Sequence, residues 1–204
     1  ADANRLDFSI PTDGQEAPWG RAQLVFIHDQ VRVPNPPQTL ADWVAYARQN
    51  PGRLTYPEPP NFHGTTFLKQ AVLETTEHAN WLTEPYQTER FDAVTANVWP
   101  LLDALHPVAW RQGLEFPDSA EALMELFADG VLDLALSFNP NDASARILDG
   151  RFPDTVRTYV HANGTIGNTH FLAIPFNAQA AEGALVWINL LLSAEAQASK
   201  ADPS

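Results

Sequence analysis

Short apolar runs rich in β-formers alternate along the chain with amphipathic segments of ten or more residues. This alternation restricts the fold more than any other feature, because helices with one apolar face must cover a sheet. It predicts an α/β fold with a largely parallel sheet. The expected strands are residues 22–27, 53–56, 114–116, 131–138, 155–160 and 169–174. The expected helices are residues 40–49, a helix from about residue 64, 91–105 with a kink at Pro100, a helix from Ser119 to Gly130, 178–192 and 193–200.

Local signals support several of these elements. Thr39 with Asp42 three residues later is typical of a helix cap, and Leu40, Trp43, Val44 and Ala47 then form one apolar face. The run 22–27 is almost wholly apolar, which favours a strand buried on both faces.

Composition excludes several classes of protein. The 204 residues include 25 Asp+Glu against 12 Lys+Arg, for a formal net charge of −13. That balance argues against binding to nucleic acid or to an anionic membrane, which both require clustered basic residues. Cysteine is absent, so disulfides and thiolate chemistry are excluded. No apolar run approaches the ~20 residues of a membrane helix. Residues 1–4 do not resemble a signal peptide, so we expect either that a leader has been removed or that the chain is part of a longer protein.

The first candidate binding segment is residues 57–66, between an expected strand and the next helix. Ligands of open α/β sheets bind beyond the carboxyl ends of strands, where loops meet helix N-termini. Gly64 would let a ligand approach the backbone closely, and the N–H groups near Thr65 and Thr66 would donate to it. The alternative is a capped loop that binds nothing.

The second candidate is residues 139–144, which follow the expected strand 131–138. The side chains of Asn139 and Asn141 can donate and accept hydrogen bonds, which suits a polar small molecule. Asparagine is also a common turn former, so a purely structural turn is favoured when this segment is taken alone. Trp19, in a segment bounded by Pro18 and Gly20, could stack on a ligand, whereas the spacing of the other tryptophans favours packing.

No arrangement typical of catalysis or metal binding is present. The six histidines are scattered, and no nucleophile elbow, phosphate-binding loop or dinucleotide motif occurs. Glu74 and Glu77 are interpreted as part of a solvated helix face. We therefore expect no catalytic residue, no metal site and no cofactor.

Several segments resemble family 1 extracellular solute-binding proteins, in particular their YnjB-like branch. The resemblance covers nearly the whole chain, and it is carried by PWGRAQLVFIHD, TLADW, NPGRLTYPEPPNFHGTTFLKQ, DLALSFNPNDAS, GTIGNTHFLAIPFNA and INLLLSAEAQASK.

The resemblance implies a type 2 periplasmic binding protein fold, in which two α/β lobes joined by hinge strands close on a ligand. Members of the family are about twice as long as this chain. Residues 21–168 would be one doubly wound lobe, and residues 1–20 and 169–204 would be hinge crossings and a remnant of the other. The implied function is that of the periplasmic substrate-binding component of an ABC importer, a monomer whose signal peptide is removed. It would deliver a small polar solute to the membrane permease subunits, with no enzymatic activity and no nucleic-acid partner.

In this interpretation Trp19 and Phe62 would stack on the solute and Arg21 would pair with a carboxylate or phosphate. Hydrogen bonds and close contacts would come from His63, Gly64, Thr65, Thr66, Asn139, Asn141, Asn168, Thr169 and His170. Two alternatives of other classes remain, the effector-sensing domain of a regulator and an enzyme domain on the same fold. The first would require an attached DNA-binding segment, and the second an activated nucleophile or an acid–base pair. A sugar, a polyamine, a thiamine-like cation and an organic anion all remain possible solutes.

Overall fold

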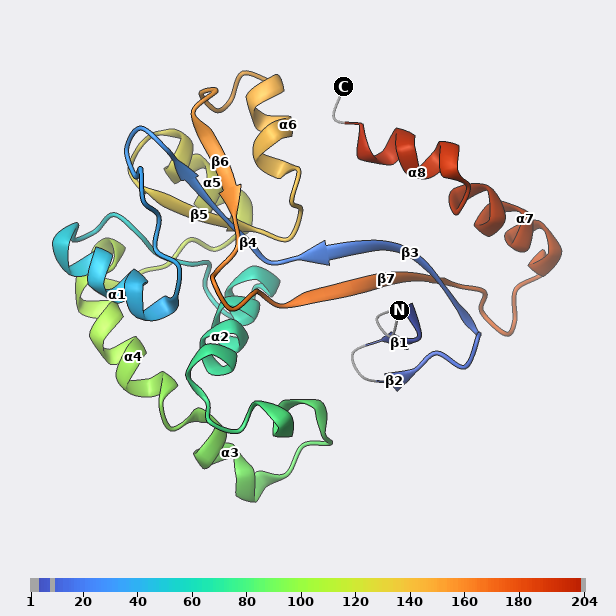
Figure 1. Ribbon diagram of the computed structural model, residues 1–204, viewed down its shortest axis with the longest axis horizontal. Coiled ribbons are helices and arrows are strands. Elements are labelled where there is room, and N and C mark those ends of the chain that lie inside the picture. Colours follow the sequence, from blue (N-terminus) through green and yellow to red (C-terminus); the bar gives the residue numbers. More distant parts are fainter. Residues whose placement is uncertain (1–3, 8–9, 203–204) are drawn as a thin grey trace. The chain divides into compact units, whose positions relative to one another are not determined.

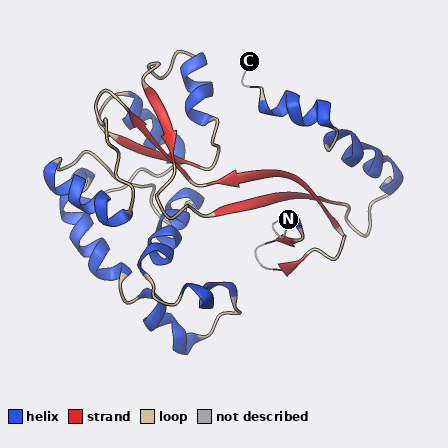
Figure 2. Cartoon of the chain, in the orientation of Figure 1, coloured by secondary structure: helices blue, strands red, loops and turns tan. Residues whose placement is uncertain are grey.

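The computed structural model describes residues 4–7 and 10–202, and the chain divides into two compact units (Figures 1 and 2). The large unit consists of residues 23–166, and the small unit consists of the described residues of 1–22 and 167–204. The chain passes from one unit to the other twice, at residues 22–23 and 166–167.

The large unit is built on a three-stranded sheet in the order β5-β4-β6. Its strands are β4 (Val25–Asp29), β5 (Leu134–Ser137) and β6 (Val156–Tyr159). Its helices are α1 (Leu40–Gln49), α2 (Phe62–Thr75), α3 (Thr88–Thr95), α4 (Val98–Leu105), α5 (Ala120–Ala128) and α6 (Asp142–Leu148), with short 3₁₀ helices η2 (Ala79–Thr83), η3 (His106–Val108) and η4 (Trp110–Gly113).

The predicted parallel sheet is wrong in its strand pairing, because the central strand β4 runs antiparallel to both neighbours. Phe26 of β4 lies opposite Leu136 on one side and Tyr159 on the other. β5 and β6, which α6 connects, do point in the same direction, as a strand–helix–strand unit requires. β4 enters directly from the small unit and is inserted between them. The alternation of strands and helices along the sequence predicts the connection from β5 through α6 to β6. It contains no information on the order of the strands in the sheet.

Three expected strands differ from those observed. The apolar run 22–27 is divided between the end of β3 (Glu16–Gln23) and the start of β4, whose residues are all buried as predicted. Residues 53–56 form no strand, although the carbonyl of Arg53 accepts a hydrogen bond from the Asp133 amide at 2.7 Å. Residues 114–116 also form no strand, because the 3₁₀ turn η4 precedes them and Leu114 is exposed.

The predicted helices of the large unit are confirmed, with shifts at their ends. Thr39 caps α1 by accepting a hydrogen bond from the Asp42 amide at 3.1 Å, and the four predicted core residues of α1 are buried. Ser119 caps α5 in the same way through the Ala122 amide at 3.1 Å. At the kink predicted for Pro100 the helix is broken into α3 and α4, and the break lies just before the proline. The proline ring would clash with the carbonyl four residues earlier, so the helix cannot continue through this point.

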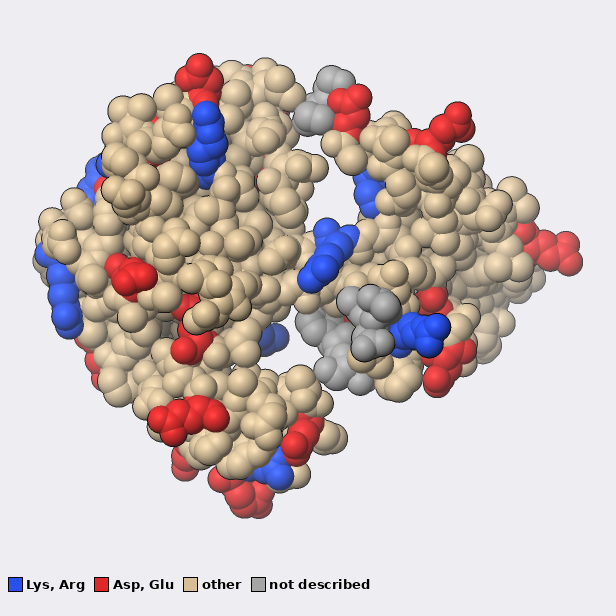
Figure 3. Space-filling view, in the orientation of Figure 1, with Lys and Arg blue, Asp and Glu red and all other residues tan. Residues whose placement is uncertain are grey.

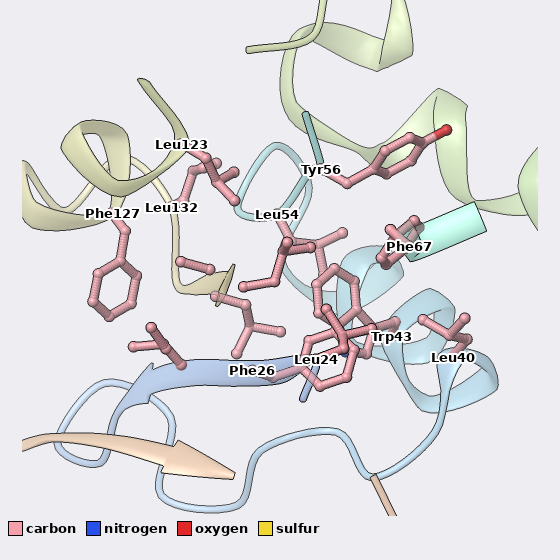
Figure 4. Close-up of a cluster of buried hydrophobic side chains, with 14 of the residues drawn as sticks. Leu24, Phe26, Leu40, Trp43, Leu54, Tyr56, Phe67, Leu123, Phe127 and Leu132 are labelled. Carbon is pink, nitrogen blue, oxygen red and sulfur yellow. The ribbon is translucent and has the colours of Figure 1, made fainter. Parts of the chain in front are cut away.

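The core of the large unit lies between the sheet and helices α1, α2, α4 and α5 (Figure 4). Its largest fully buried side chains include Trp43, Phe26, Phe67 and Phe127. Asp133 is also buried, and its carboxylate accepts hydrogen bonds from Arg53 at 2.6 Å and from the Tyr46 hydroxyl at 2.7 Å. These partners satisfy the buried charge of Asp133, which directly precedes β5.

The small unit contains β1 (Leu6–Asp7), β2 (Ile10–Pro11), β3, β7 (Gly167–Ala173), α7 (Ala181–Leu191) and α8 (Ala194–Ala201). β3 pairs with β7, and β1 pairs with β2. No residue of α7 is buried, and its apolar side chains Leu185, Val186 and Trp187 are between 60% and 72% exposed. The packing expected for Trp187 is therefore not observed within this unit, nor is that expected for Trp99 of α4, which is 52% exposed.

Candidate functional site

The two candidate segments of the large unit lie together. Phe62, the first residue of α2, packs against Phe138 with ring centroids 4.8 Å apart, and His63 lies 5.8 Å from the same ring. Phe138 immediately precedes Asn139, so these contacts join the start of α2 to the loop after β5. Phe62 nevertheless remains 59% exposed. We call Phe62, His63 and Phe138 the aromatic cluster.

The backbone donors expected at Thr65 and Thr66 are not free. The Thr65 amide donates to the carbonyl of Asn61 at 2.8 Å, and the Thr66 amide lies within α2, beyond the helix's free first amides. The Thr66 hydroxyl also points back to the helix and donates to the carbonyl of Phe62 at 2.8 Å. α2 begins two residues earlier than the sequence pattern indicates, so these groups belong to the second turn of the helix. The Asn61 side chain caps the helix by accepting a hydrogen bond from the His63 amide at 2.9 Å.

Gly64 does not provide space for a ligand. A Cβ atom at this position would lie 1.9 Å from the carbonyl oxygen of Pro57. The preceding loop itself occupies the space, so glycine is required here for packing within the chain. This contact gives Gly64 a packing role, and its predicted close approach to a ligand stays a prediction.

The Asn139 loop forms a turn and retains free polar groups. The Asn139 side-chain oxygen accepts a hydrogen bond from the Asn141 amide at 3.0 Å, which is the turn-forming role considered above. Both residues are exposed. Among the described residues, the Asn141 side chain and the side-chain NH₂ of Asn139 have no hydrogen-bond partner, so both can bind a polar atom.

His63 is neutral at physiological pH. Burial lowers its pKa below the ordinary histidine value, and the charge of Asp142 only partly opposes this effect. A neutral imidazole has one donor and one acceptor nitrogen. The aromatic cluster thus combines apolar ring surface with one uncharged polar group.

The predicted residues of the small unit are arranged differently. The ammonium group of Lys200 lies 4.2 Å from the ring centroid of Trp19 and donates to the Trp19 carbonyl at 2.7 Å. One face of the indole is thus already occupied, and local sequence gave no indication that Lys200 lies there. Arg21 is exposed and forms no ion pair with a described residue of its unit.

Asn168, Thr169 and His170 line a hollow of about 330 Å³ within the small unit. Its other lining residues are Asp7, Glu16, Phe171 and Ala173. The carboxylates of Asp7 and Glu16 therefore lie beside the three predicted residues, although about 150 residues of sequence separate the two groups. No local pattern could have indicated them, because only the packing of β1 and β3 near β7 brings them there.

Glu74 is not part of a solvated face, which corrects the prediction from sequence. Its side chain is 9% exposed, and it accepts a hydrogen bond from Nδ1 of the buried His161 at 2.6 Å. Burial alone would raise the pKa of Glu74, but hydrogen bonds from His161, Gln70 and the Leu40 amide together lower it. The carboxylate is therefore ionised inside the core.

Other functional groups are sparse. In Figure 3, Lys and Arg are scattered among acidic residues and form no continuous basic patch on the face shown. Within residues 4–7 and 10–202, no three His, Asp or Glu side chains are close enough together to hold a metal ion. None of the helices in this described part of the chain is long and apolar enough to cross a membrane.

Comparison with known proteins identifies the family. Residues 2–203 match the family described as bacterial extracellular solute-binding protein. The chain belongs to this family. Within it, the chain is 45% identical to protein YnjB of Escherichia coli over 200 residues, which are 98% of this chain and 52% of YnjB. The resemblance noted from the sequence motifs is thus confirmed.

Solved structures show the same fold. An ABC transporter protein from Clostridium perfringens matches with a TM-score of 0.62 and 15% identity, over 91% of this chain and 52% of that one. The spermidine/putrescine substrate-binding protein PotD from Streptococcus pneumoniae matches with a TM-score of 0.60 and 11% identity, over 91% and 50%. The chain is therefore mixed α/β, consistent with a partial type 2 periplasmic binding protein fold. It spans about half the length of these relatives.

Proposed function

We propose that this chain is part of the periplasmic substrate-binding component of an ABC importer. The complete protein captures a small polar solute between two lobes and delivers it to the membrane permease as a monomer. Membership of the solute-binding family supports the class of function. The observation that carries the proposal for the site is the aromatic cluster with its exposed Phe62, which adjoins the loop that carries the unpaired side-chain NH₂ of Asn139 and the unpaired side chain of Asn141.

This combination suits solute binding because small-molecule sites join apolar or aromatic surface with a few fixed polar groups. Phe62 exposes most of its ring to solvent and yet is held by Phe138 and by its position in the first turn of α2. A ring held in this way can stack on a solute without a large loss of conformational freedom. Asn139, Asn141 and neutral His63 would supply the hydrogen bonds.

We further propose that residues 21–168 form the second lobe and that residues 1–20 and 169–204 are hinge crossings and part of the first lobe. The passages between the two compact units lie within two residues of these boundaries, which supports the proposal. The exposed apolar side chains of α7 also support it, since a helix with this surface normally packs against further structure. Trp19, Arg21, Asn168, Thr169 and His170 would then contribute to the site from the hinge side.

A binding role is favoured over an enzymatic one. An acid–base enzyme needs a titratable pair that a substrate can reach. Within the described part of the large unit, the hydrogen-bonded carboxylate–histidine pair, Glu74 and His161, is enclosed in the core.

The proposal can be tested by native mass spectrometry of the full-length protein purified from its host. We expect a co-purified small molecule, retained by the wild-type protein and lost or strongly reduced in Phe62→Ala and in Asn141→Ala. Tyr86→Ala is the matched control, because Tyr86 is an aromatic residue of the large unit that is 75% exposed outside the cluster. Equal retention by the wild-type protein and both site variants would contradict the proposed site.

A further inference from the structure

Two polar side chains of α2 point into the protein, one helical turn apart. Gln70 is fully buried, and the side chain of Glu74 is 9% exposed. The Gln70 side-chain nitrogen donates to Glu74 at 2.8 Å. Because buried polar groups are retained only with partners, the contacts of this pair indicate which parts of the chain α2 holds in place.

Gln70 binds the segment that leads from β6 to β7, which passes beside α2 (Figure 1). Its side-chain oxygen accepts a hydrogen bond from the Ile166 amide at 2.8 Å, and its nitrogen donates to the Gly164 carbonyl at 3.2 Å. Glu74 extends the contact by accepting from His161 at 2.6 Å and from the Leu40 amide at 2.8 Å. The Gln70 amide thereby uses its oxygen and both N–H groups.

The same segment is joined to the chain that enters the large unit. The Leu24 amide donates to the Ile166 carbonyl at 2.8 Å, and the Gln23 side chain donates to the Thr165 hydroxyl at 3.2 Å. The Thr165 hydroxyl donates in turn to the Leu24 carbonyl. Residues 23–24 and 165–166 are the last residues of the large unit at its two passages to the small unit. Gln70 therefore fixes, directly or through one partner, both connecting segments.

α2 also carries the aromatic cluster. Phe62 begins the helix, and Gln70 lies eight residues later, about 12 Å along the helix axis. A helix moves as a rigid element, so a displacement of its first turn is transmitted to Gln70.

We propose that Gln70 is a positioning residue of the solute-binding cycle. It holds both connecting segments against α2, and so couples the proposed solute site at the start of this helix to the movement of the small unit relative to the large one. The coupling to solute depends on the function proposed above, whereas the mechanical restraint does not. If this restraint exists, loss of the Gln70 amide should make residues 23–24 and 165–166 more mobile while the large unit stays folded.

The restraint can be measured without the solute. The chain has no cysteine, so Ala128→Cys on α5 and Ala181→Cys on α7, both at exposed positions, give one spin label in each unit. Double electron–electron resonance then reports the distribution of distances between the labels. We expect Gln70→Leu to broaden this distribution. Hydrogen exchange at residues 161–168 should become at least about tenfold faster, with little change in α5 and β5.

Two further variants make the result decisive. Thr165→Val removes the two hydrogen bonds of the Thr165 hydroxyl to the entering segment, leaves the bond between Leu24 and Ile166 and does not alter α2, so it should also broaden the distribution. Val98→Ala removes buried volume from α4 and leaves all of these hydrogen bonds in place, so it should lower stability and leave the width unchanged. The proposal is overturned if Gln70→Leu lowers the melting temperature but leaves the width and the local exchange as in wild type, or if Val98→Ala broadens the distribution equally. A failure to find a co-purified solute would reject the proposed function and leave these results unaffected.

Discussion

Gly64 is confined by the loop that precedes α2. The Pro57 carbonyl oxygen lies where a side chain at position 64 would begin. Because this oxygen belongs to the backbone and cannot rotate away, only glycine fits at this position. At the scale of a residue, a single contact such as that between Gly64 and Pro57 explains why a particular amino acid is required. The same holds for Glu74, where three donors keep a buried carboxylate ionised.

Gly64→Ala should destabilise the large unit by about 2 kcal/mol or more, because α2 or the Pro57 loop must shift to admit the methyl group. Urea denaturation followed by far-UV circular dichroism measures this change. Gly183→Ala is the control, since Gly183 lies in α7 with nothing near its absent side chain. It should stabilise the chain by about 0.5–1 kcal/mol through helix propensity. Similar effects of the two substitutions would contradict the steric explanation.

Glu74 should make stability depend on acidic pH. Its pKa is lower in the folded chain than in the unfolded one, so its contribution is fully present above the unfolded pKa and is lost as pH falls through the folded pKa. We expect Glu74→Gln to be less stable than wild type at neutral pH and to lose less stability between pH 7 and about pH 3. Urea midpoints across this range test the prediction. Parallel curves for the two proteins would show that the carboxylate is not ionised in the core.

Helix termini are the elements that the sequence specifies best. Thr39 and Ser119 each accept a hydrogen bond from the amide three residues later, so each capping side chain lies close in sequence to the group that it satisfies. The break before Pro100 has the same local origin. The start of α2 is different, because the Asn61 cap and the two following aromatic residues are not a strong helix signal.

Thr39→Ala and Ser119→Ala should each cost about 1 kcal/mol of stability, because each leaves a first-turn amide without its acceptor. Equilibrium urea denaturation of each single variant and of the double variant measures this. The two caps belong to different helices, so their effects should add to within about 0.5 kcal/mol. Thr83→Ala, in the exposed 3₁₀ helix η2, serves as the reference for loss of a hydroxyl outside a cap. An equal cost there would argue against a capping role.

The whole molecule consists of two units connected at two points, and it spans about half the length of the relatives that it matches. Solute binding by a two-lobed protein buries the solute only when both walls contribute. The aromatic cluster and the Asn139 loop belong to one unit alone.

The 204-residue chain should therefore bind the solute of the full-length protein much more weakly than that protein does. Loss of a few polar partners, at about 1 kcal/mol net for each hydrogen bond, reduces affinity about 100-fold or more when the stacking on the opposite wall is lost as well. Calorimetry of both proteins against the solute found by mass spectrometry makes the comparison. Equal dissociation constants would show that this chain contains the entire site and that the proposed lobe boundaries are wrong.

The sequence by itself determined the α/β class, most helices, the Thr39 cap, the buried strand β4 and the family. These features depend on periodicity, on neighbouring residues and on motifs, which are all local. Only the tertiary structure decided the insertion of β4 between β5 and β6, the burial of Glu74 against His161, the contact of Lys200 with Trp19 and the place of Asp7 and Glu16 beside Asn168. Each of these pairs residues far apart in the chain, and a contact of this kind depends on how whole elements pack.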